Sequence, residues 1–200
     1  MSYQTWKRTV DTIGAIVGLL CIAPLTPFIA LAIAIDSRGP IIVRLARVSN
    51  GKIIYAYKFR SMVAGAHNLK HRYASQNERT DGPFFKIHHD PRLTRVGKIL
   101  RKFRIDEFPQ LWNVLRGELS LVGPRPHEPE EVICYPAEYR HLINAIAGVT
   151  GLSQVNGSSS LPFLHELALD DQYLKQQSLA LDARIIFKTI GILFTDPTAV

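Results

Sequence analysis

The feature that most constrains this chain is an uncharged, mostly aliphatic run of 24 residues from Thr12 to Ile35. A helix needs about 20 such residues to cross the hydrocarbon core of a bilayer, so the run is long enough to enter a membrane. It is too long for the apolar part of a cleavable signal peptide. Pro24 and Pro27 lie near its centre, where each removes a backbone donor and clashes with the preceding turn. The run therefore predicts two helices joined at a break.

The charges that flank this run bear on how it enters a membrane. Five cations lie on its two sides: Lys7, Arg8, Arg38, Arg44 and Arg47. Because Lys and Arg mark the cytoplasmic flanks of membrane segments, we expect both ends of the run on the cytoplasmic side. We favour a re-entrant membrane hairpin over residues 1–40 to a kinked spanning helix. A buried core helix of a soluble protein is a third interpretation.

The net charge of +7 is unevenly distributed along the chain. Residues 1–104 contain 18 Lys and Arg against 5 Asp and Glu, net +13, whereas residues 105–200 contain 6 against 12, net −6. A basic half predicts an anionic partner, such as nucleic acid, anionic lipid or a phosphorylated metabolite. The acidic second half and the lack of a helix-turn-helix or aromatic RNA-binding signature argue against nucleic acid.

Residues 41–200 predict a compact cytosolic domain of the α+β class. Ile41–Val48 and Ile53–Phe59 flank Asn50-Gly51, and this pattern predicts a β-hairpin because Asn-Gly tolerates the positive φ angles of a tight turn. Three helices are expected, over residues 63–79, 91–104 and 182–194. The first is polar, and the second is basic and amphipathic with a solvated face or a place at the membrane surface. The third is amphipathic, and we favour core packing for it over a place on the lipid surface.

Two groups of residues that often signal chemistry are expected to be structural here. Cys21 and Cys134 are the only cysteines; they predict no disulfide framework and a reducing compartment, and we expect both to be packing residues. His88-His89-Asp90 lacks the spacing of zinc-binding helices, so surface histidines are expected.

Asp106 and Glu107 are adjacent carboxylates at the start of a predicted helix, in which Pro109 suits the first turn and Gly117 the C-terminal stop. One interpretation is that they cap the helix. The other is catalytic: the side chains project about 100° apart on a helix, so one could be a nucleophile and the other a metal ligand. Ten Lys and Arg residues between positions 70 and 104 would suit a polyphosphate nearby.

Two loops add weaker signals. Arg125 lies between two prolines, so its backbone is stiff and its guanidinium is suited to clamping a phosphate, although a plain proline-rich turn is an alternative. Residues 148–157 contain three glycines and four polar side chains, which suits close approach to a ligand but does not match the spacing of a P-loop or a dinucleotide-binding loop.

Taken in order, the motifs of this chain resemble the bacterial sugar transferases, the monotopic phosphoglycosyl transferases. The resemblance rests on the apolar hairpin with its central proline and on four further segments: Lys58-Phe59-Arg60-Ser61-Met62, residues 106–111, residues 123–126 and residues 148–155. The chain is similar to the small form of the family, without a multi-span N-terminal extension.

The resemblance implies an activity, a location and partners. A phosphosugar would pass from a UDP-sugar to undecaprenyl phosphate with release of UMP, the first membrane step of glycoconjugate synthesis such as exopolysaccharide, O-antigen or glycoprotein glycan. The location implied is the bacterial inner (cytoplasmic) membrane, with the catalytic domain on the cytoplasmic face. Inner-membrane lipid is an expected partner, nucleic acid is not, and a homodimer is left open. The alternative is a membrane-tethered basic binding module without catalysis.

The resemblance also implies roles for individual residues. Asp106 would be the nucleophile that forms a covalent phosphosugar adduct, and Glu107 would hold Mg²⁺. Phosphate would be bound by Arg60, Arg101, Arg125 and Pro126, and the nucleotide-sugar loop would comprise Gln154, Asn156, Ser158 and Asp170. Two positions depart from the family pattern: Ser158 stands where many relatives have arginine, and Ala23 stands where many have serine before the hairpin proline.

Overall fold

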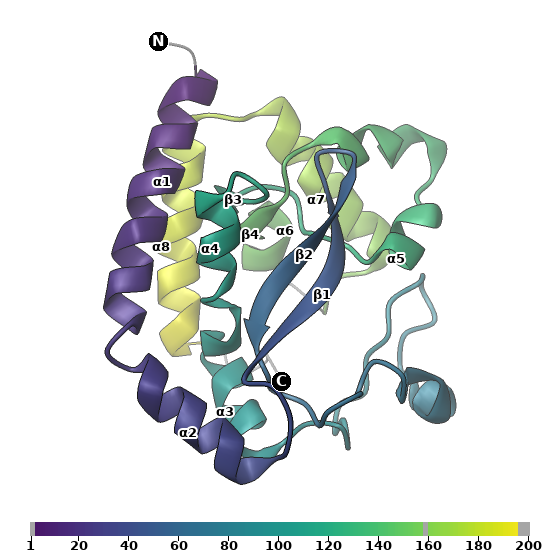
Figure 1. Cartoon of the computed structure of the whole chain (residues 1–200). Helices are drawn as coiled ribbons and strands as arrows, with labels where there is room; N and C mark the ends of the chain where they lie inside the picture. Colours follow the sequence, from purple (N-terminus) through teal and green to yellow (C-terminus); the bar gives the residue numbers. More distant parts are fainter. Residues whose placement is uncertain (1–2, 158–159, 196–200) are drawn as a thin grey trace.

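The computed structural model describes residues 3–157 and 160–195 (Figure 1). Within them, helices and short strands mix in one α+β arrangement, with the β-hairpin on one side and the long helices on the other. The elements are α1 (Tyr3–Ile22), α2 (Thr26–Asp36), β1 (Ile42–Ser49), β2 (Lys52–Phe59), η1 (Lys70–Gln76), α3 (Arg95–Lys102), η2 (Ile105–Glu107), α4 (Gln110–Leu115), β3 (Ser120–Val122), α5 (Pro129–Ile133), η3 (Ala137–Asn144), β4 (Gly148–Thr150), α6 (Leu152–Val155), α7 (Phe163–Lys175) and α8 (Leu179–Thr195), where η denotes a 3₁₀ helix.

The apolar run forms two helices with a break between them, as predicted. α1 and α2 meet at an angle of 63°, and Pro27 lies in the first turn of α2, where its missing N–H has no helical partner to lose. Within the residues that the structure describes, no single helix is both long and apolar enough to cross a membrane; α1 and α2 meet that criterion only together. Membrane entry by this pair stays a prediction.

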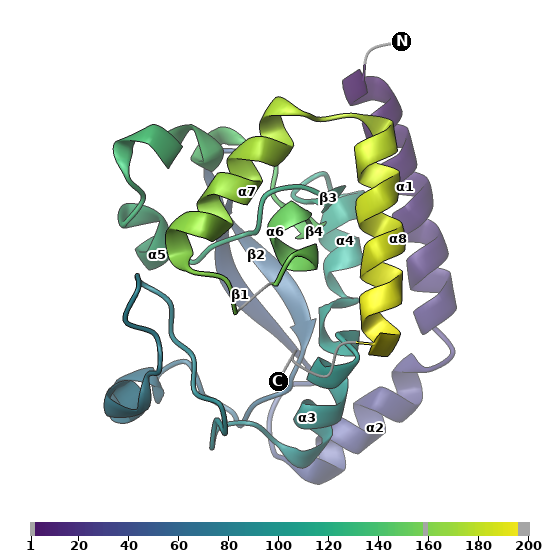
Figure 2. The same cartoon turned by 180° about the vertical axis from the view of Figure 1, so that it is seen from behind.

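One face of α1 packs on the rest of the chain and the other is exposed. Ala15 joins a core cluster with Val114 of α4 and Leu119, and α1 lies beside α8 in both views (Figures 1 and 2). A Cβ on Gly14 would come within 2.5 Å of the Leu121 side chain, so small residues permit this close approach. On the outer face, Leu20 is 68% exposed.

The β-hairpin forms as predicted, and a second sheet appears that the sequence did not indicate. β1 and β2 pair antiparallel, and the turn residues Asn50 and Gly51 have φ angles of 51° and 67°. β3 and β4 pair in parallel, which converts the start of the expected 148–157 loop into a strand. A Cβ on Gly148 would clash with the backbone of Gly123, so glycine is required at this crossing.

Two helix predictions need correction. The expected polar helix over 63–79 is wrong in extent: only Lys70–Gln76 is helical, as a 3₁₀ segment with no buried residue. Gly65 has a φ of 73°, which a right-handed helix does not allow. The basic helix is shorter than expected, starting after the Thr94 N-cap and ending before Arg104, whose φ is 52°. Arg92 is not on a solvated face; it is buried and paired with Asp90 at 2.6 Å.

The C-terminal helix packs in the core, as expected, but only along part of its apolar surface. Ile185 of α8 is 1% exposed, whereas Phe187 and Ile190 are 74% and 48% exposed. Both cysteines are free, as predicted, yet both are exposed, so the expectation that they pack is wrong. The adjacent histidines at 88 and 89 lie on the surface, as expected.

Candidate active site

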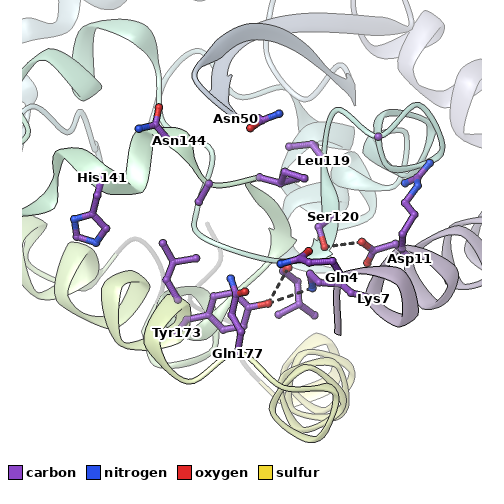
Figure 3. Close-up of a pocket in the computed structure, with 16 residues that line it drawn as sticks. Gln4, Lys7, Asp11, Asn50, Leu119, Ser120, His141, Asn144, Tyr173 and Gln177 are labelled. Carbon is purple, nitrogen blue, oxygen red and sulfur yellow. Dashed lines mark hydrogen bonds between the residues drawn. The ribbon is translucent and has the colours of Figure 1, made fainter. Parts of the chain in front are cut away.

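Five of the predicted site residues line one cavity of about 570 Å³. They are Arg60, Arg101, Asp106, Glu107 and Arg125. The cavity lies between the hairpin, the irregular segment that follows it, and the turn η2. A second cavity of about 570 Å³ lies between α1 and the end of α7 (Figure 3), but none of the predicted site residues lines it. Its buried acid, Asp11, accepts hydrogen bonds from the Ser120 hydroxyl at 2.8 Å and the Leu121 N–H at 2.9 Å, so that carboxylate is already engaged in the fold.

The two adjacent acids lie in η2, immediately before α4. Arg104 begins this turn in the left-handed conformation with φ 52°, a backbone state that costs free energy in a residue with a side chain. The N-cap of α4 is Pro109, with no side-chain hydrogen bond, so neither acid caps this helix. Asp106 is buried, and the Glu107 side chain is 31% exposed. The turn thus presents two carboxylates to the cavity in different surroundings.

Those surroundings shift the two carboxyl pKa values in opposite directions. Burial raises the pKa of Asp106, and the negative charge of Glu107 adds to the rise, although Lys58 opposes it. Burial would also raise the pKa of Glu107, but the Lys58 ammonium, whose Nζ is 2.6 Å from Glu107 Oε1, outweighs it and lowers that pKa overall. Glu107 is therefore the more firmly ionised acid, and Asp106 holds its proton more tightly than an ordinary aspartate.

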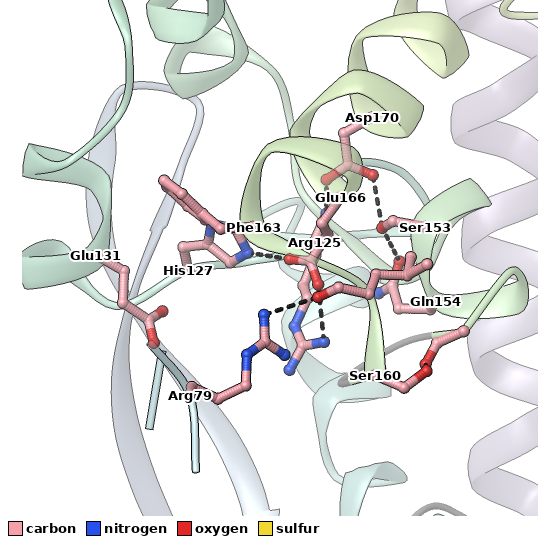
Figure 4. A network of polar contacts seen from close by, with 12 residues as sticks. Arg79, Arg125, His127, Glu131, Ser153, Gln154, Ser160, Phe163, Glu166 and Asp170 are labelled. Atoms are coloured by element: carbon pink, nitrogen blue, oxygen red, sulfur yellow. Dashed lines mark hydrogen bonds and ion pairs between the residues drawn. The ribbon is translucent and has the colours of Figure 1, made fainter. Parts of the chain in front are cut away.

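Arg125 is held at both its main chain and its side chain by α7 (Figure 4). Its backbone N–H donates to Asp170 Oδ2 at 2.9 Å, and Asp170 Oδ1 accepts from the Ser153 hydroxyl at 2.7 Å. Its Nη1 lies 3.3 Å from Glu166 Oε2. Burial raises the pKa of Asp170 to about 6, against the effect of these hydrogen bonds. Asp170 thus reaches the site through the backbone of Arg125 and does not itself line the cavity.

Arg60 and Arg101 line the cavity but already have protein partners. The Arg60 guanidinium donates to the backbone carbonyl oxygens of Pro40 at 2.7 Å and Ser37 at 2.5 Å, and its Nη2 reaches Ile33 O at 3.2 Å. These contacts anchor the C-terminal end of α2 to the end of β2. Arg101 Nε donates to the Ser61 hydroxyl at 3.0 Å. Within the described part of the chain, one side-chain hydrogen bond holds Arg101, whereas several hold the Arg60 guanidinium, most of them to backbone oxygens.

Three further predicted residues that the structure describes, Gln154, Asn156 and Pro126, do not line the cavity. Gln154 is buried beside Ser153, and Asn156 is exposed and accepts a hydrogen bond from Lys188 at 2.9 Å. Pro126 follows Arg125 without lining the cavity. Ser158 lies outside the described residues.

Several charged residues that the sequence did not assign to the site also line the cavity, among them Lys58, Arg79 and Glu166. Lys58 is the ion-pair partner of Glu107. Its position in the same sequence motif as Arg60 was the feature that could have indicated a place in the site. Arg79 donates from Nη2 to Leu161 O at 2.7 Å and lies 5.0 Å from the centre of the Phe84 ring. Glu166 is fully buried and is 41 residues from its partner Arg125, a separation over which no local pattern could indicate the pairing.

Comparison with known proteins agrees with the family that the motifs indicate. The chain matches the bacterial sugar transferase family over residues 2–196 and belongs to it, which confirms the family predicted from the sequence. It is 40% identical over 198 residues to the undecaprenyl-phosphate glucose phosphotransferase of Komagataeibacter xylinus, covering 92% of this chain and 35% of that protein.

Two further relatives differ in length from this one. The chain is 39% identical over 194 residues to galactosyl transferase CpsE of Streptococcus agalactiae, covering 96% of this chain and 43% of the relative. It is 34% identical over 188 residues to the exopolysaccharide production protein ExoY of Rhizobium meliloti, covering 92% of this chain and 83% of the relative. The chain thus spans less than half of the first two relatives and most of the third.

Proposed function

We propose that this chain transfers a phosphosugar from a UDP-sugar to undecaprenyl phosphate, releasing UMP, at the cytoplasmic face of the bacterial inner membrane. The observation that carries the proposal is the adjacent pair Asp106 and Glu107, with pKa values shifted in opposite directions, in a cavity lined by many cations. Two anionic substrates require such cations, and two unlike carboxylates permit two roles. Relatives named undecaprenyl-phosphate sugar phosphotransferases support the substrate classes.

The chemistry assigned to Asp106 is nucleophilic. A carboxylate oxygen of Asp106 attacks the sugar-bearing phosphorus, forming one P–O bond while the bond to the bridging oxygen breaks and UMP leaves with that electron pair. An oxygen of undecaprenyl phosphate then attacks the same phosphorus and restores the Asp106 carboxylate. Lys58, Arg101 and Arg125 offset the negative charge of the reacting groups. The raised pKa of Asp106 implies that activity declines as the pH falls through that value.

Glu107 is the residue proposed to hold Mg²⁺. Among the described residues there is no group of three or more His, Cys, Asp or Glu side chains that would hold a metal by themselves. Mg²⁺ is commonly held by one or two carboxylates together with substrate phosphates, so Glu107 and a bound diphosphate would suffice. The lowered pKa of Glu107 keeps it ionised for this role. When bound, the ion would neutralise charge on the diphosphate.

The lipid acceptor is proposed to reach the cavity from the side of α2 and α3. These helices pack against each other, and their outer surfaces expose Phe28, Leu31 and Ile35 on α2, Ile99 on α3 and Phe103 just after α3. Exposed apolar side chains in such number are typical of a surface that contacts lipid or protein. A re-entrant α1–α2 hairpin would place this surface in the membrane beside the headgroups that carry the acceptor phosphate.

Intact-mass measurement tests the proposal. Wild-type protein mixed with Mg²⁺ and each of a panel of UDP-sugars, without undecaprenyl phosphate, should gain the mass of one phosphosugar with one donor, and UMP should appear. Asp106→Asn should gain no mass, because a neutral amide does not attack phosphorus. Asp171→Asn is the matched control, since Asp171 pairs with Lys175 on α7 and does not line the cavity. An adduct on Asp106→Asn would refute the assignment, and a wild type inert to the whole panel with and without acceptor would favour the binding module.

A further inference from the structure

A chain of three buried polar side chains, Glu166, His127 and Tyr135, lies behind Arg125; Figure 4 shows Arg125, Glu166 and His127. Arg125 Nη1 is 3.3 Å from Glu166 Oε2, Glu166 Oε1 is 2.5 Å from His127 Nε2, and His127 Nδ1 is 2.6 Å from the Tyr135 hydroxyl. The exposed fractions are 0% for Glu166, 2% for His127 and 6% for Tyr135, against 33% for the side chain of Arg125. The chain of contacts therefore runs from the buried Tyr135 to Arg125, the member whose side chain is partly exposed.

The hydrogen bonds among Glu166, His127 and Tyr135 restrict where their protons lie. An ionised carboxylate only accepts, so the bond to Glu166 requires a proton on His127 Nε2. The Tyr135 hydroxyl completes the contact at Nδ1, where it can donate to a neutral ring or accept from a protonated one. In either case both ring nitrogens have a partner, and the Nε2 proton points at Glu166.

The surroundings keep Glu166 ionised and its partners fixed. Burial would raise the pKa of Glu166, but the charge of Arg125 and the hydrogen bond from His127 lower it overall. The His127 ring packs edge-on against Phe84 with 5.2 Å between ring centres, and its backbone carbonyl accepts from the Val48 N–H at 3.0 Å. Because these side chains are buried, their hydrogen bonds are strong and few other hydrogen-bond partners are within reach.

We propose that His127 is a positioning residue, which acts through Glu166 to hold the Arg125 guanidinium in the orientation that binds the phosphates of a nucleoside diphosphate sugar. This inference rests on the proposed function. A free arginine side chain loses much rotamer entropy when it grips a phosphate, and a guanidinium that is already held loses less. Because His127 occupies one Glu166 oxygen, Arg125 is bound through the other oxygen alone and keeps its remaining donors for the ligand.

Removing the His127 ring should release the Arg125 guanidinium from the orientation that Glu166 imposes. In His127→Leu, Glu166 Oε1 loses its donor inside the protein. The carboxylate then takes a second donor from Arg125 and turns it away from the cavity, or becomes protonated and frees it. Either response weakens phosphate binding without changing any residue that lines the cavity. His127→Gln is the conservative variant, because its amide nitrogen can still donate to Glu166.

The probe is UMP, which is common to every UDP-sugar, with affinity measured by isothermal titration calorimetry. We expect His127→Leu to weaken binding about 10-fold, as for the loss of one charge-assisted interaction, and His127→Gln to stay within about 3-fold of wild type. Arg125→Ala should weaken binding at least as much as His127→Leu. Adding His127→Leu to Arg125→Ala should then change the affinity no further, because coupled residues are not additive.

A purely structural His127 would give a different pattern, with the same loss of affinity in both backgrounds. That result, or unchanged affinity in His127→Leu, would overturn the inference while leaving the proposed function intact. A wild type that does not bind UMP would overturn both. Thermal melts show whether each variant folds. If His127→Leu does not, the cycle is run with Tyr135→Phe, which removes only the hydroxyl group at Nδ1 and should weaken binding about 3-fold in the wild-type background alone.

Discussion

Lys58 Nζ lies 2.6 Å from Glu107 Oε1, and this ion pair makes two neighbouring acids chemically unlike. Lys58 is the strongest influence lowering the pKa of both carboxyls, yet it hydrogen-bonds only Glu107, and Asp106 keeps a raised pKa because of its burial. The charge of Lys58 on β2 thus lowers the pKa of a carboxyl 49 residues further along the chain. Electrostatic control of this kind can be tested by removing the charges separately.

Asp106→Asn should stabilise the fold while it removes activity. The native state binds the Asp106 proton more tightly than the unfolded chain does, so the ionised carboxylate destabilises the fold above its raised pKa. At pH 8 the amide should raise Tm, by about 2–4 °C for each kcal/mol relieved. The gain should vanish as the pH falls toward 3.8, the ordinary aspartate value. Asp171, whose pKa is lowered by Lys175, gives the opposite expectation: Asp171→Asn should not raise Tm. A lower Tm for Asp106→Asn would contradict the argument.

Lys58→Met should move the acid limb of the pH–rate profile to higher pH. The Lys58 charge favours ionisation of both acids, so its loss raises both pKa values and protonates Asp106 at a pH where the wild type is ionised. Initial rates of UMP release between pH 5.5 and 9 measure the shift. Lys52→Met, at the exposed start of the same strand, should leave the profile in place; an unmoved profile for Lys58→Met would exclude electrostatic control by Lys58.

Glu107→Gln should change the metal dependence of the reaction more than Asp106→Asn can. It retains the nucleophile but removes the charged oxygen assigned to Mg²⁺. We expect part of the lost rate to return as Mg²⁺ is raised, whereas Asp106→Asn should stay inactive at every concentration. Rates titrated with Mg²⁺ separate the two variants. Equal rates for Glu107→Gln and wild type at low Mg²⁺ would argue against the ligand assignment.

Arg60→Met should loosen α2 from the domain. The guanidinium donates to carbonyl oxygens of Ser37 and Pro40 from a buried position, and hydrogen bonds that involve a charged donor contribute about 1.5–3 kcal/mol each. We expect a loss of about 2–3 kcal/mol in the free energy of unfolding, measured by denaturation in detergent. Arg38→Met, at an exposed neighbour, should change little. Unchanged stability with weaker UMP binding would instead support the phosphate role that the family resemblance implies.

The bend between α1 and α2 should determine the topology in the membrane. Cysteine tags placed before Lys7 and after Arg44 should both label from the cytoplasmic side if the pair is re-entrant. Replacing Pro24 and Pro27 together with leucine restores two backbone donors, so the helices should straighten and the second tag should move to the far side. Opposite-side labelling of the unmodified chain would rule out the hairpin.

The sequence by itself determined the features that depend on local backbone preferences. Asn50-Gly51 adopts the positive φ angles that its hairpin requires, and Gly117 ends the segment after α4 with φ 74°. Pro27 begins the second helix after the break. Glycine and asparagine tolerate positive φ angles and proline fixes its own φ, so their effect can be read without knowing the rest of the fold. The ordered motifs likewise sufficed for the family.

Tertiary structure decided which charged groups are buried and which distant ones meet. Arg92 is basic in a basic stretch, yet it is buried against Asp90. Glu166 is an ordinary acid in the sequence of α7, yet it is the fully buried partner of both Arg125 and His127. Such pairings depend on long-range packing that excludes water, and the exclusion of water is also what shifts their pKa values. A carboxylate's neighbours along the chain say little about its neighbours in space, and the latter set its chemistry.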